Sequence, residues 1–311
     1  MRRETVKIFK KNKLGKIVGL ILVGILIWGL VEPYFLDIEN EKAAIPNLPQ
    51  EWEGKKVAVF GDFQVGMWMD NTKTVENAAE EIAEMKPDAV LIIGDFVYHS
   101  LEDPKAEMQK VEKLISPLVK TDIPIFAVLG NHDYNMHNKK DEPKIESVKN
   151  VRTSLEEMGV TLLHNRSVPI NLLKDNEVSI GKPQESSLYL AGLGAYWPDN
   201  DEPAKALRDI PKDAPRMIMM HNPESFAKLP ANSAPIAVAG HTHGGQFRIP
   251  FAPEWSYKSL VAKDRATVDG WIEDFGAKGN RLYVNRGIGF SDLPLRINTP
   301  PEITVFTLTE A

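Results

Sequence analysis

Two histidines separated by a single residue, His241 and His243, are the part of the sequence whose types and spacing most directly suggest chemistry. The apolar run 236–239 precedes them and predicts a buried strand. Neutral imidazole is the commonest transition-metal ligand, but alternate residues of an extended chain point in opposite directions, so a shared site requires a turn. Gly240 and the glycine pair 244–245 supply that turn. A lone His-x-His pattern also occurs in loops with two surface histidines, so this pattern alone does not establish a metal site.

Polar side chains follow several other apolar segments that predict strands. Each stands directly after such a segment, and the set consists of Asp62, Asp95, Asn131 with His132 and Asp133, His221, and the histidines at 241 and 243. In an open α/β sheet, ligands gather just beyond the carboxyl ends of the strands. We therefore expect these oxygen and imidazole donors to converge on one site.

The donor types indicate which metals and which reaction such a site would serve. The chain contains no cysteine, which excludes disulfides, thiolate metal sites and cysteine nucleophiles. Carboxylate, amide and imidazole donors suit Mn, Fe, Zn or Mg. The set suffices for two divalent ions that share one carboxylate. Two ions about 3.5–4 Å apart clamp a phosphorus centre and generate a hydroxide nucleophile from bound water.

The elements that must position these residues alternate between strands and helices in the first half of the chain. Apolar runs predict strands at 57–60, 89–93, 125–129 and 160–163, and helical spacing predicts helices over 75–85, 108–118 and 145–158. This alternation is typical of a largely parallel sheet with helices packed on it. The second half predicts further strands at 188–191, 217–220, 236–239, 282–284 and 303–308, with a helix around 204–210. Because the two halves share one site, we predict a single domain.

The order of these blocks resembles a known family. The blocks are Gly61-Asp62-x-Gln64, Gly94-Asp95, Gly130-Asn131-His132-Asp133, His221 and Gly240-His241-x-His243. They are similar to the five blocks of calcineurin-like metallophosphoesterases, over about residues 55–308. The run 240–246 and the tail 284–303 resemble the membrane-associated bacterial phosphodiesterases of that family. The resemblance implies an α/β fold, a four-layer α-β-β-α sandwich of two mixed sheets, with a dinuclear metal site at its crest.

The resemblance also implies a role for each donor. Asp95 would bridge both ions and take part in catalysis with His132, which would face the substrate and protonate the leaving oxygen or stabilise the transition state. The remaining ligands would divide between a first ion, held by Asp62 and His243, and a second, held by Asn131, His221 and His241. Asp133 either orients the His132 ring or is a solvated turn residue.

Three further residues, Gln64, Arg286 and Arg296, have roles that are less clearly defined. The first block of the family usually reads Asp-x-His, whereas this chain has Gln64 as the third residue. Gln64 is either a weak oxygen ligand or a support for the other ligands, which leaves occupancy and metal identity open. Arg286 is a candidate for binding substrate phosphate, because guanidinium binds it bidentately. Arg296 is a second candidate, although a surface ion pair fits it equally well.

The N-terminus predicts a membrane segment. Residues 17–31 are uninterrupted apolar sequence, and residues 1–16 carry seven cations against one anion. Together with flanking residues up to 36, this run approaches the roughly 20 residues of a spanning helix. A cleaved secretory signal shares the basic and apolar parts, but no small-x-small cleavage site follows promptly. We favour an uncleaved anchor that interacts with the lipid bilayer.

These features define the expected organisation. Residues 1–16 form a basic cytoplasmic tail, 17–36 a transmembrane anchor, 37–54 a linker, and 55–311 the metallophosphoesterase domain. The basic flank stays in the cytoplasm, so the catalytic domain of this single-pass protein of the inner (cytoplasmic) membrane lies on the extracytoplasmic side. The net charge is −6, and because the tail contributes +6, the remainder carries −12. No nucleic-acid partner is expected of so acidic a body.

The function predicted from sequence is hydrolysis of a phosphodiester or pyrophosphate bond by a metal-activated hydroxide. The expected substrate is a phosphorylated small molecule or lipid, in particular an envelope lipid or nucleotide conjugate. A UDP-diacylglucosamine pyrophosphatase of lipid A synthesis is one alternative, and a non-catalytic binding protein with a decayed site is another. Residues 247–261, rich in apolar side chains, form either ordinary core or an apolar wall fitted to a lipid-like substrate or the bilayer.

Overall fold

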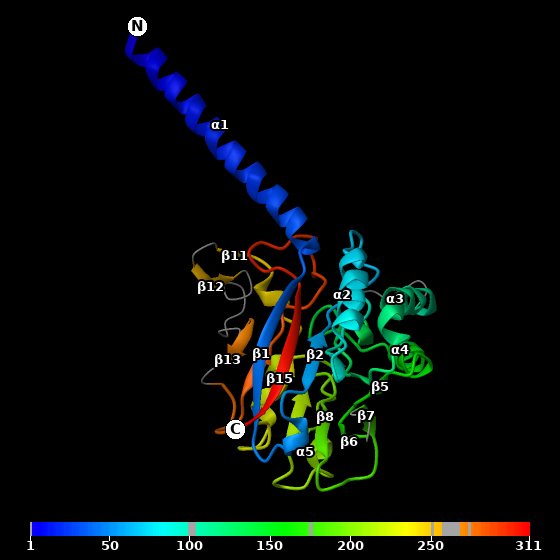
Figure 1. Cartoon of the computed structure of the whole chain (residues 1–311). Coiled ribbons are helices and arrows are strands. Elements are labelled where there is room, and N and C mark those ends of the chain that lie inside the picture. The colour runs from blue at the N-terminus through cyan, green and yellow to red at the C-terminus, as the bar shows by residue number, and fades with distance from the viewer. Residues whose placement is uncertain (1, 99–103, 174–176, 250–251, 257–267, 273–274) are drawn as a thin grey trace.

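The architecture was analysed in a computed structural model of the whole chain. It describes residues 2–98, 104–173, 177–249, 252–256, 268–272 and 275–311 (Figure 1). Part of the apolar segment 247–261, namely 250–251 and 257–261, therefore lies outside the described residues.

The first sheet has six strands in the order β1-β15-β2-β3-β4-β5. Strands β2 to β5 run parallel, β15 is antiparallel to β2, and β1 is parallel to β15. Their bounds are β1 Asp37–Ile45, β2 Lys56–Phe60, β3 Ala89–Ile92, β4 Ile125–Ala127, β5 Thr161–Leu162 and β15 Glu302–Glu310. The sheet is therefore mixed.

The second sheet is also mixed and has seven strands, in the order β13-β14-β10-β9-β8-β6-β7. Strands β14, β10, β9 and β8 are parallel, and the strands at both edges are antiparallel. The bounds are β6 Arg166–Leu172, β7 Val178–Ile180, β8 Leu188–Gly192, β9 Arg216–Met219, β10 Ala237–Ala239, β13 Gly270–Ile272 and β14 Leu282–Val284. A two-stranded hairpin consists of β11, Arg248–Ile249, and β12, Ala252–Ser256.

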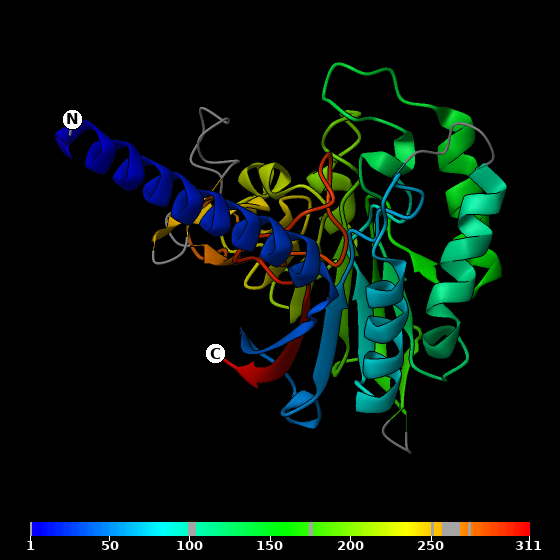
Figure 2. The same ribbon diagram turned by 90° about the horizontal axis from the view of Figure 1, so that it is seen from above.

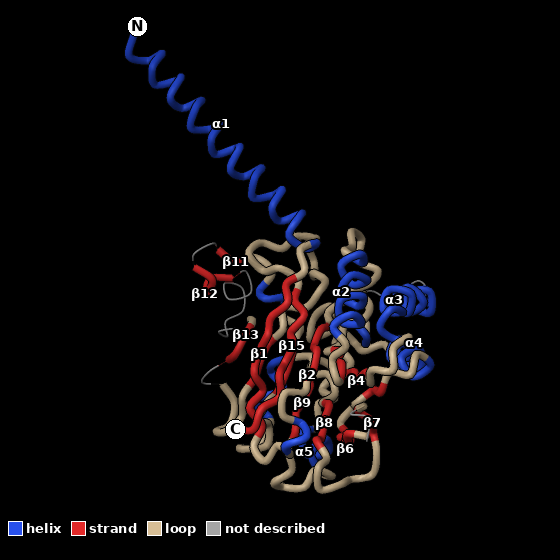
Figure 3. Tube along the Cα trace, in the orientation of Figure 1, coloured by secondary structure: helices blue, strands red, loops and turns tan. Residues whose placement is uncertain are grey.

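Three long helices cover the outer face of the first sheet (Figure 2). They are α2 Thr72–Met85, α3 Pro104–Val119 and α4 Ile145–Glu157. The outer face of the second sheet carries only short helices, α5 Pro203–Leu207 and the 3-10 helix η4 Pro223–Lys228, between loops (Figure 3). The expected four-layer sandwich of two mixed sheets is confirmed, with one thin outer layer.

The core follows from the alternation of side chains along the strands. In β2, Ala58 and Phe60 pack with the helices, whereas Val57 and Val59 face the second sheet. Successive side chains of a strand point to opposite faces, so a strand that is apolar throughout is buried on both sides. All four of these side chains are at most 1% exposed. The sheet is therefore covered on both faces, and its strand ends are free to carry polar groups.

Residues 37–54, expected to form a linker, are instead part of the fold. Nine residues of β1 pair in register with β15, from Asp37 opposite Glu302 to Ile45 opposite Glu310. The 3-10 helix η2, Gln50–Trp52, then buries Trp52, which is 1% exposed. An edge strand characteristically carries charged residues, and its partner supplies the pairing. From sequence alone, the charged residues of β1 therefore resemble those of a linker, because the partner strand β15 is distant in the chain.

The N-terminal segment forms one continuous helix, α1, over Arg2–Val31. No break in this helix separates the expected tail, residues 1–16, from the expected span, residues 17–36. The helix ends two residues before Pro33, which has no backbone N–H to continue the helical hydrogen bonds, and a 3-10 turn, η1 Glu32–Tyr34, follows. Among the described residues, one helix is long and apolar enough to cross a membrane, over Lys13–Tyr34. A signal sequence meets the same criterion.

Candidate metal centre

The carboxyl ends of β2, β3, β4, β9 and β10 meet at one edge of the sandwich. The backbone N–H of His241 donates to both carboxylate oxygens of Asp62, at 3.2 and 3.1 Å, and thereby joins the ends of the two sheets. The N–H of Gly240 donates to the carbonyl of His221 at 2.9 Å, and that of Asp62 to the carbonyl of Gly94 at 2.9 Å. The five polar strand ends predicted from sequence therefore lie together.

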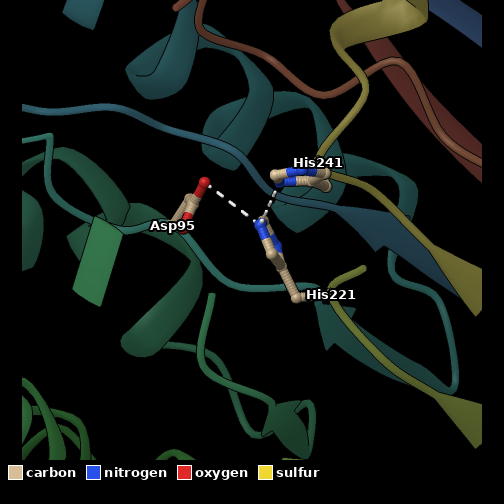
Figure 4. Close-up of side chains that lie close together, drawn as sticks. All are labelled: Asp95, His221 and His241. Carbon is tan, nitrogen blue, oxygen red and sulfur yellow. Dashed lines mark hydrogen bonds and ion pairs between the residues drawn. The ribbon is translucent and has the colours of Figure 1, made fainter. Parts of the chain in front are cut away.

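One group of donors surrounds the Nε2 atom of His221 (Figure 4). This atom lies 3.1 Å from Asp95 Oδ2, 3.1 Å from Asn131 Oδ1 and 3.2 Å from His241 Nδ1. Asp95, His221 and His241 each offer an atom within 4.8 Å of the others. The remaining ring nitrogen of His221, Nδ1, contacts the Ile93 carbonyl at 2.8 Å. That contact fixes the ring with Nε2 toward the other donors.

A second group of donors also contacts Asp95. The Nε2 atom of Gln64 donates to Asp95 Oδ2 at 2.9 Å and lies 3.5 Å from His243 Nε2. His243 Nε2 in turn is 3.9 Å from Asp62 Oδ1. All seven predicted ligand positions therefore form two adjacent groups, and Asp95 belongs to both.

The donors fit a divalent cation. The Oε1 atom of Gln64 is buried and has no hydrogen-bond partner among the described residues, which is costly unless a further group binds it. Three polar atoms crowd the single Nε2 of His221, although one ring nitrogen has at most one proton to donate. A cation between these atoms would satisfy all of them. Nitrogen and oxygen donors without sulfur match the ions predicted from sequence.

Charge interactions without a metal support the same conclusion. Burial alone would lower the pKa of His221, but the Asp95 carboxylate raises that pKa to about 9. Burial would likewise raise the pKa of Asp95, yet the positive charges of His221 and His132 hold it well below its usual range. The proton on His221 thus takes the place of a cation beside Asp95. A metal ion that binds here must displace it.

The backbone conformation brings the ligands to one side. Asp62, Gln64, Asp95, His241 and His243 all have positive φ, between 50° and 70°. Non-glycine residues adopt this region rarely, and such strain is common at functional sites. Because the two histidines flank a residue of ordinary helical geometry, they reach a shared site despite their i, i+2 spacing. The turn predicted around His241 is confirmed.

Glycines allow the strand ends to approach closely. A Cβ atom on Gly130 would lie 2.1 Å from Asp95 Oδ1, and one on Gly240 would lie 2.4 Å from Asp62 Oδ2. Neither distance permits a side chain. The carboxylates of both ligand groups are therefore packed against glycine backbone, which fixes their positions.

His132 lies beside the same site and is 5% exposed. Its Nδ1 contacts the Tyr98 carbonyl at 3.1 Å, and its ring stacks on that of Tyr98 with centroids 4.8 Å apart. Because a carbonyl oxygen only accepts, Nδ1 carries a proton in this contact. Its backbone N–H donates to Asp95 Oδ1 at 2.9 Å. The ring is thus oriented by Tyr98 while its backbone holds the shared carboxylate.

The environment of Asp133 differs from both alternatives predicted from sequence. Its carboxylate accepts backbone N–H bonds from Asp95 at 3.0 Å, Phe96 at 2.9 Å and Gly130 at 2.8 Å. Burial, followed by the nearby charge of Asp95, raises its pKa to about 7. Asp133 is neither a solvated turn residue nor the group hydrogen-bonded to the His132 ring. It ties the ends of β3 and β4 together.

Arg286, predicted to bind substrate phosphate, is occupied elsewhere. Its guanidinium lies within 4 Å of four carboxylates, those of Asp37, Glu39, Asp269 and Glu302. Burial lowers its pKa, but the four carboxylates together, Glu302 foremost, outweigh burial and raise that pKa. Its Nε and Nη2 atoms are therefore engaged by protein groups, and phosphate binding by Arg286 stays a prediction. The sequence alone did not reveal β1, which supplies two of these partners.

Arg296 is fully buried rather than a surface residue. Its guanidinium donates to the carbonyl oxygens of Arg286, Gly287, Gly289 and Thr299. The Gly289 carbonyl also contacts Nδ1 of His243 at 3.3 Å. Arg296 therefore holds the segment against which a predicted ligand rests.

Three aromatic residues at the site were not predicted from sequence. Tyr98 stacks on His132, His137 lies 4.8 Å from that ring, and Trp197 lies 5.0 Å from the His241 ring. Tyr98 follows Asp95 by three residues, and His137 follows His132 by five, so proximity in the chain was a usable signal for both. Nothing local to Trp197 indicates its position, because β8 brings it from the other sheet.

Comparison with known proteins agrees with this geometry. The phosphodiesterase YaeI of Escherichia coli (strain K12) is 30% identical over 225 residues, 72% of this chain and 72% of that protein. The metallophosphoesterase YkuE of Bacillus subtilis (strain 168) is 26% identical over 314 residues, 97% of this chain and 98% of that protein. The UDP-2,3-diacylglucosamine pyrophosphatase LpxG of Chlamydia trachomatis serovar D is 24% identical over 304 residues, 88% and 89% of the two chains. The profile of the calcineurin-like phosphoesterases matches residues 55–245, more than half of the chain and all of the predicted ligand blocks. This protein therefore belongs to the calcineurin-like phosphoesterase family and is a metal-dependent phosphoester hydrolase.

Proposed function

We propose that the protein is a membrane-anchored phosphoesterase that uses two divalent ions, one in each ligand group, to hydrolyse a phosphodiester or pyrophosphate bond. The observation that carries this proposal is the position of Asp95, whose Oδ2 contacts both Gln64 Nε2 and His221 Nε2. A carboxylate so placed between two donor groups suits a bridging ligand. His132 lies directly beside it.

The residues around the centre have distinct parts in this reaction. Bound ions would supply Lewis acidity and lower the pKa of water. His132 is oriented through its Nδ1 contact with the Tyr98 carbonyl, so its Nε2 is the atom that gives a proton to the leaving oxygen. Burial of Asp62, Asp95, Asn131 and His221, each 0% exposed, excludes bulk water from the ligands.

We infer the substrate class from the anchor and from the relatives. A helix suited to the membrane directly precedes the domain, which favours an envelope lipid or a lipid-linked nucleotide conjugate. The names of two relatives refer to a phosphodiesterase and to a UDP-2,3-diacylglucosamine pyrophosphatase. The second name supports that pyrophosphatase activity as the alternative for this chain. The basic N-terminus favours an extracytoplasmic domain in the inner membrane.

Hydrolysis assays on the full-length protein in detergent test the reaction class. The metal-stripped protein receives Mn, Zn, Fe or Mg and is assayed with bis-p-nitrophenyl phosphate, p-nitrophenyl phosphate and UDP-2,3-diacylglucosamine. We expect metal-restored diesterase or pyrophosphatase activity that is lost in Asp95→Asn and reduced about 10²–10⁴-fold in His132→Ala. Asp209→Asn, whose side chain is 73% exposed, is the matched control and should keep full activity.

The outcomes separate the alternatives. Folded protein that binds metal but hydrolyses none of these substrates would favour a non-catalytic binding protein. Activity on UDP-2,3-diacylglucosamine alone would favour the pyrophosphatase reading. Fusion of alkaline phosphatase to the C-terminus tests the side of the membrane, and an inactive fusion would place the domain in the cytoplasm.

A further inference from the structure

The membrane helix joins the domain without a flexible linker. The last turn of α1 packs on the segment before β15, where the Arg296 N–H donates to the Gly29 carbonyl at 3.0 Å. The buried Glu32 carboxylate accepts the backbone N–H groups of Asn298, at 2.9 Å, and Thr299. Asn71 donates to the Pro33 carbonyl at 3.1 Å. The orientation of the domain relative to α1 is therefore fixed by contacts on both sides of the helix end.

The apolar segment is only about as long as the hydrocarbon core of a bilayer is thick. The stretch Lys13–Tyr34 has 22 residues, which span about 33 Å at 1.5 Å per residue. The hydrocarbon core of a bilayer is about 30 Å thick. Since contacts with the domain already begin at Gly29, a helix that crosses the bilayer holds the domain against the headgroups.

Exposed apolar side chains surround the end of α1. We call them the apolar rim: Tyr34 (48% exposed), Phe35 (63%), Trp68 (72%), Met69 (43%), Ile249 (52%) and Leu293 (51%). Among the described residues outside α1, the other large exposed apolar side chains are Ile145, Leu173 and Ile180, on α4 and the β6–β7 hairpin. Figure 1 shows α1 leaving the domain at the end where β11 and the segment before β15 lie, whereas β6 and β7 lie at the opposite end. The rim is thus concentrated where the membrane would be.

The segments that carry the rim also carry the metal ligands. Trp68 and Met69 follow Gln64 in the loop after β2, and the chain reaches Ile249 six residues after His243. Gln246, between them, donates to the Leu293 carbonyl at 2.8 Å. The rim and the ligand groups are therefore two parts of the same edge of the sandwich.

We propose that the apolar rim rests in the interface of the bilayer that α1 spans, so that the metal-bearing edge faces the membrane surface. This inference rests on the proposed membrane anchor and deepens the proposed function. It identifies the substrate as a phosphate group held at headgroup level by an apolar tail that stays in the bilayer. Trp and Tyr, both present in the rim, are enriched at this interface. The body carries −12, so apolar contact, rather than attraction to anionic lipid, would hold the edge down.

Single labels test the orientation directly, since the chain has no cysteine. The variants Trp68→Cys, Ile249→Cys and Leu293→Cys are labelled with a fluorophore in the full-length protein, reconstituted in phosphatidylcholine vesicles. Ile180→Cys is the matched control, because Ile180 is 45% exposed and lies on β7. Lipid carrying a nitroxide near the headgroup is then added as quencher. We expect at least about twofold quenching at two or more rim positions and none at position 180.

Two labelling outcomes would overturn the inference. Labels at the rim that are quenched no more than the control would place the metal-bearing edge away from the bilayer. Rim labels protected from lipid but cross-linking between chains would make the rim a contact between two copies. The readout does not depend on hydrolysis, so an inactive protein with quenched rim labels would refute the proposed reaction while the orientation stands. Active protein with unquenched labels would refute the orientation alone.

Discussion

Gln64 offers the sharpest test of how the chain binds metal. Its side chain is 1% exposed, its Nε2 donates to Asp95, and its Oε1 has no partner. If Oε1 is a ligand, Gln64→Leu removes one donor atom at nearly constant volume. Gln64→His supplies an imidazole instead, and the positive φ of 53° at this position is one that histidine tolerates.

The size of the effect follows from the unpaired oxygen. A buried acceptor without a partner costs about 1–3 kcal/mol. A metal ion that takes this oxygen as a ligand recovers that amount, which corresponds to about 5- to 150-fold in affinity at 1.4 kcal/mol per factor of ten. We expect Gln64→Leu to weaken metal binding by a factor in this range. Gln64→His should strengthen it, because imidazole is the better ligand for Mn, Fe or Zn.

Titration calorimetry and metal-dependent thermal stability measure both variants. Free metal at 100 times the Kd stabilises the folded protein by about 2.7 kcal/mol, and a tenfold weaker site reduces this to about 1.4 kcal/mol. Asp209→Asn should leave the affinity unchanged. Equal metal affinity and stoichiometry in Gln64→Leu and the parent protein would refute the assignment of Gln64 as a ligand.

Three further predictions follow from the contacts around the centre. The pKa of His221 is raised to about 9 in the folded protein, so protonated His221 stabilises the metal-free protein below pH 6.5, and this stabilisation is lost as pH rises through 9. Metal binding at pH 7.5 should therefore release about one proton from His221, measured by calorimetry in buffers of different ionisation heat. Asp133→Asn turns an amide donor toward backbone N–H groups and should lower the free energy of unfolding by about 1–3 kcal/mol, measured by urea denaturation. Deletion of residues 1–45 removes β1, including the fully buried Ile45, and should lower that energy by at least about 2–5 kcal/mol relative to deletion of residues 1–36; equal stability of the two would show that β1 is dispensable.

The convergence of the donors could be predicted from sequence because most of them stand just beyond the carboxyl end of a strand, whereas the role of each as a ligand rests on the family resemblance and stays a prediction. His221 and His241 come from different strands, yet both stand at a carboxyl end, and parallel strands bring such ends to one edge. The glycines that flank His241 and His243 predicted the turn there in the same way. At these positions the local sequence pattern is enough to predict where the side chain lies.

Other features could not be predicted because their constraint lies in a distant partner. The charged strand β1 is defined by β15, more than 250 residues later in the chain. Arg286 forms ion pairs with two carboxylates that β1 contributes, and these pairs could not be foreseen for the same reason. The burial of Arg296 depends on four carbonyl groups of its own segment, whose path no periodicity reveals.

The charge of the ligand set explains how so acidic a protein can attract a phosphate. Of the seven ligand positions, only Asp62 and Asp95 are carboxylates, so the neutral amides and imidazoles leave the set at −2. Two divalent ions, as proposed, would bring the crest to +2 within a body of −12. A bound cation is often the largest local charge at a site and sets its electrostatics. Without metal, the charges of His221 and His132 at most balance the two carboxylates, so the centre would offer a phosphate no net attraction. The metal therefore determines both the chemistry at the centre and whether the substrate approaches it at all.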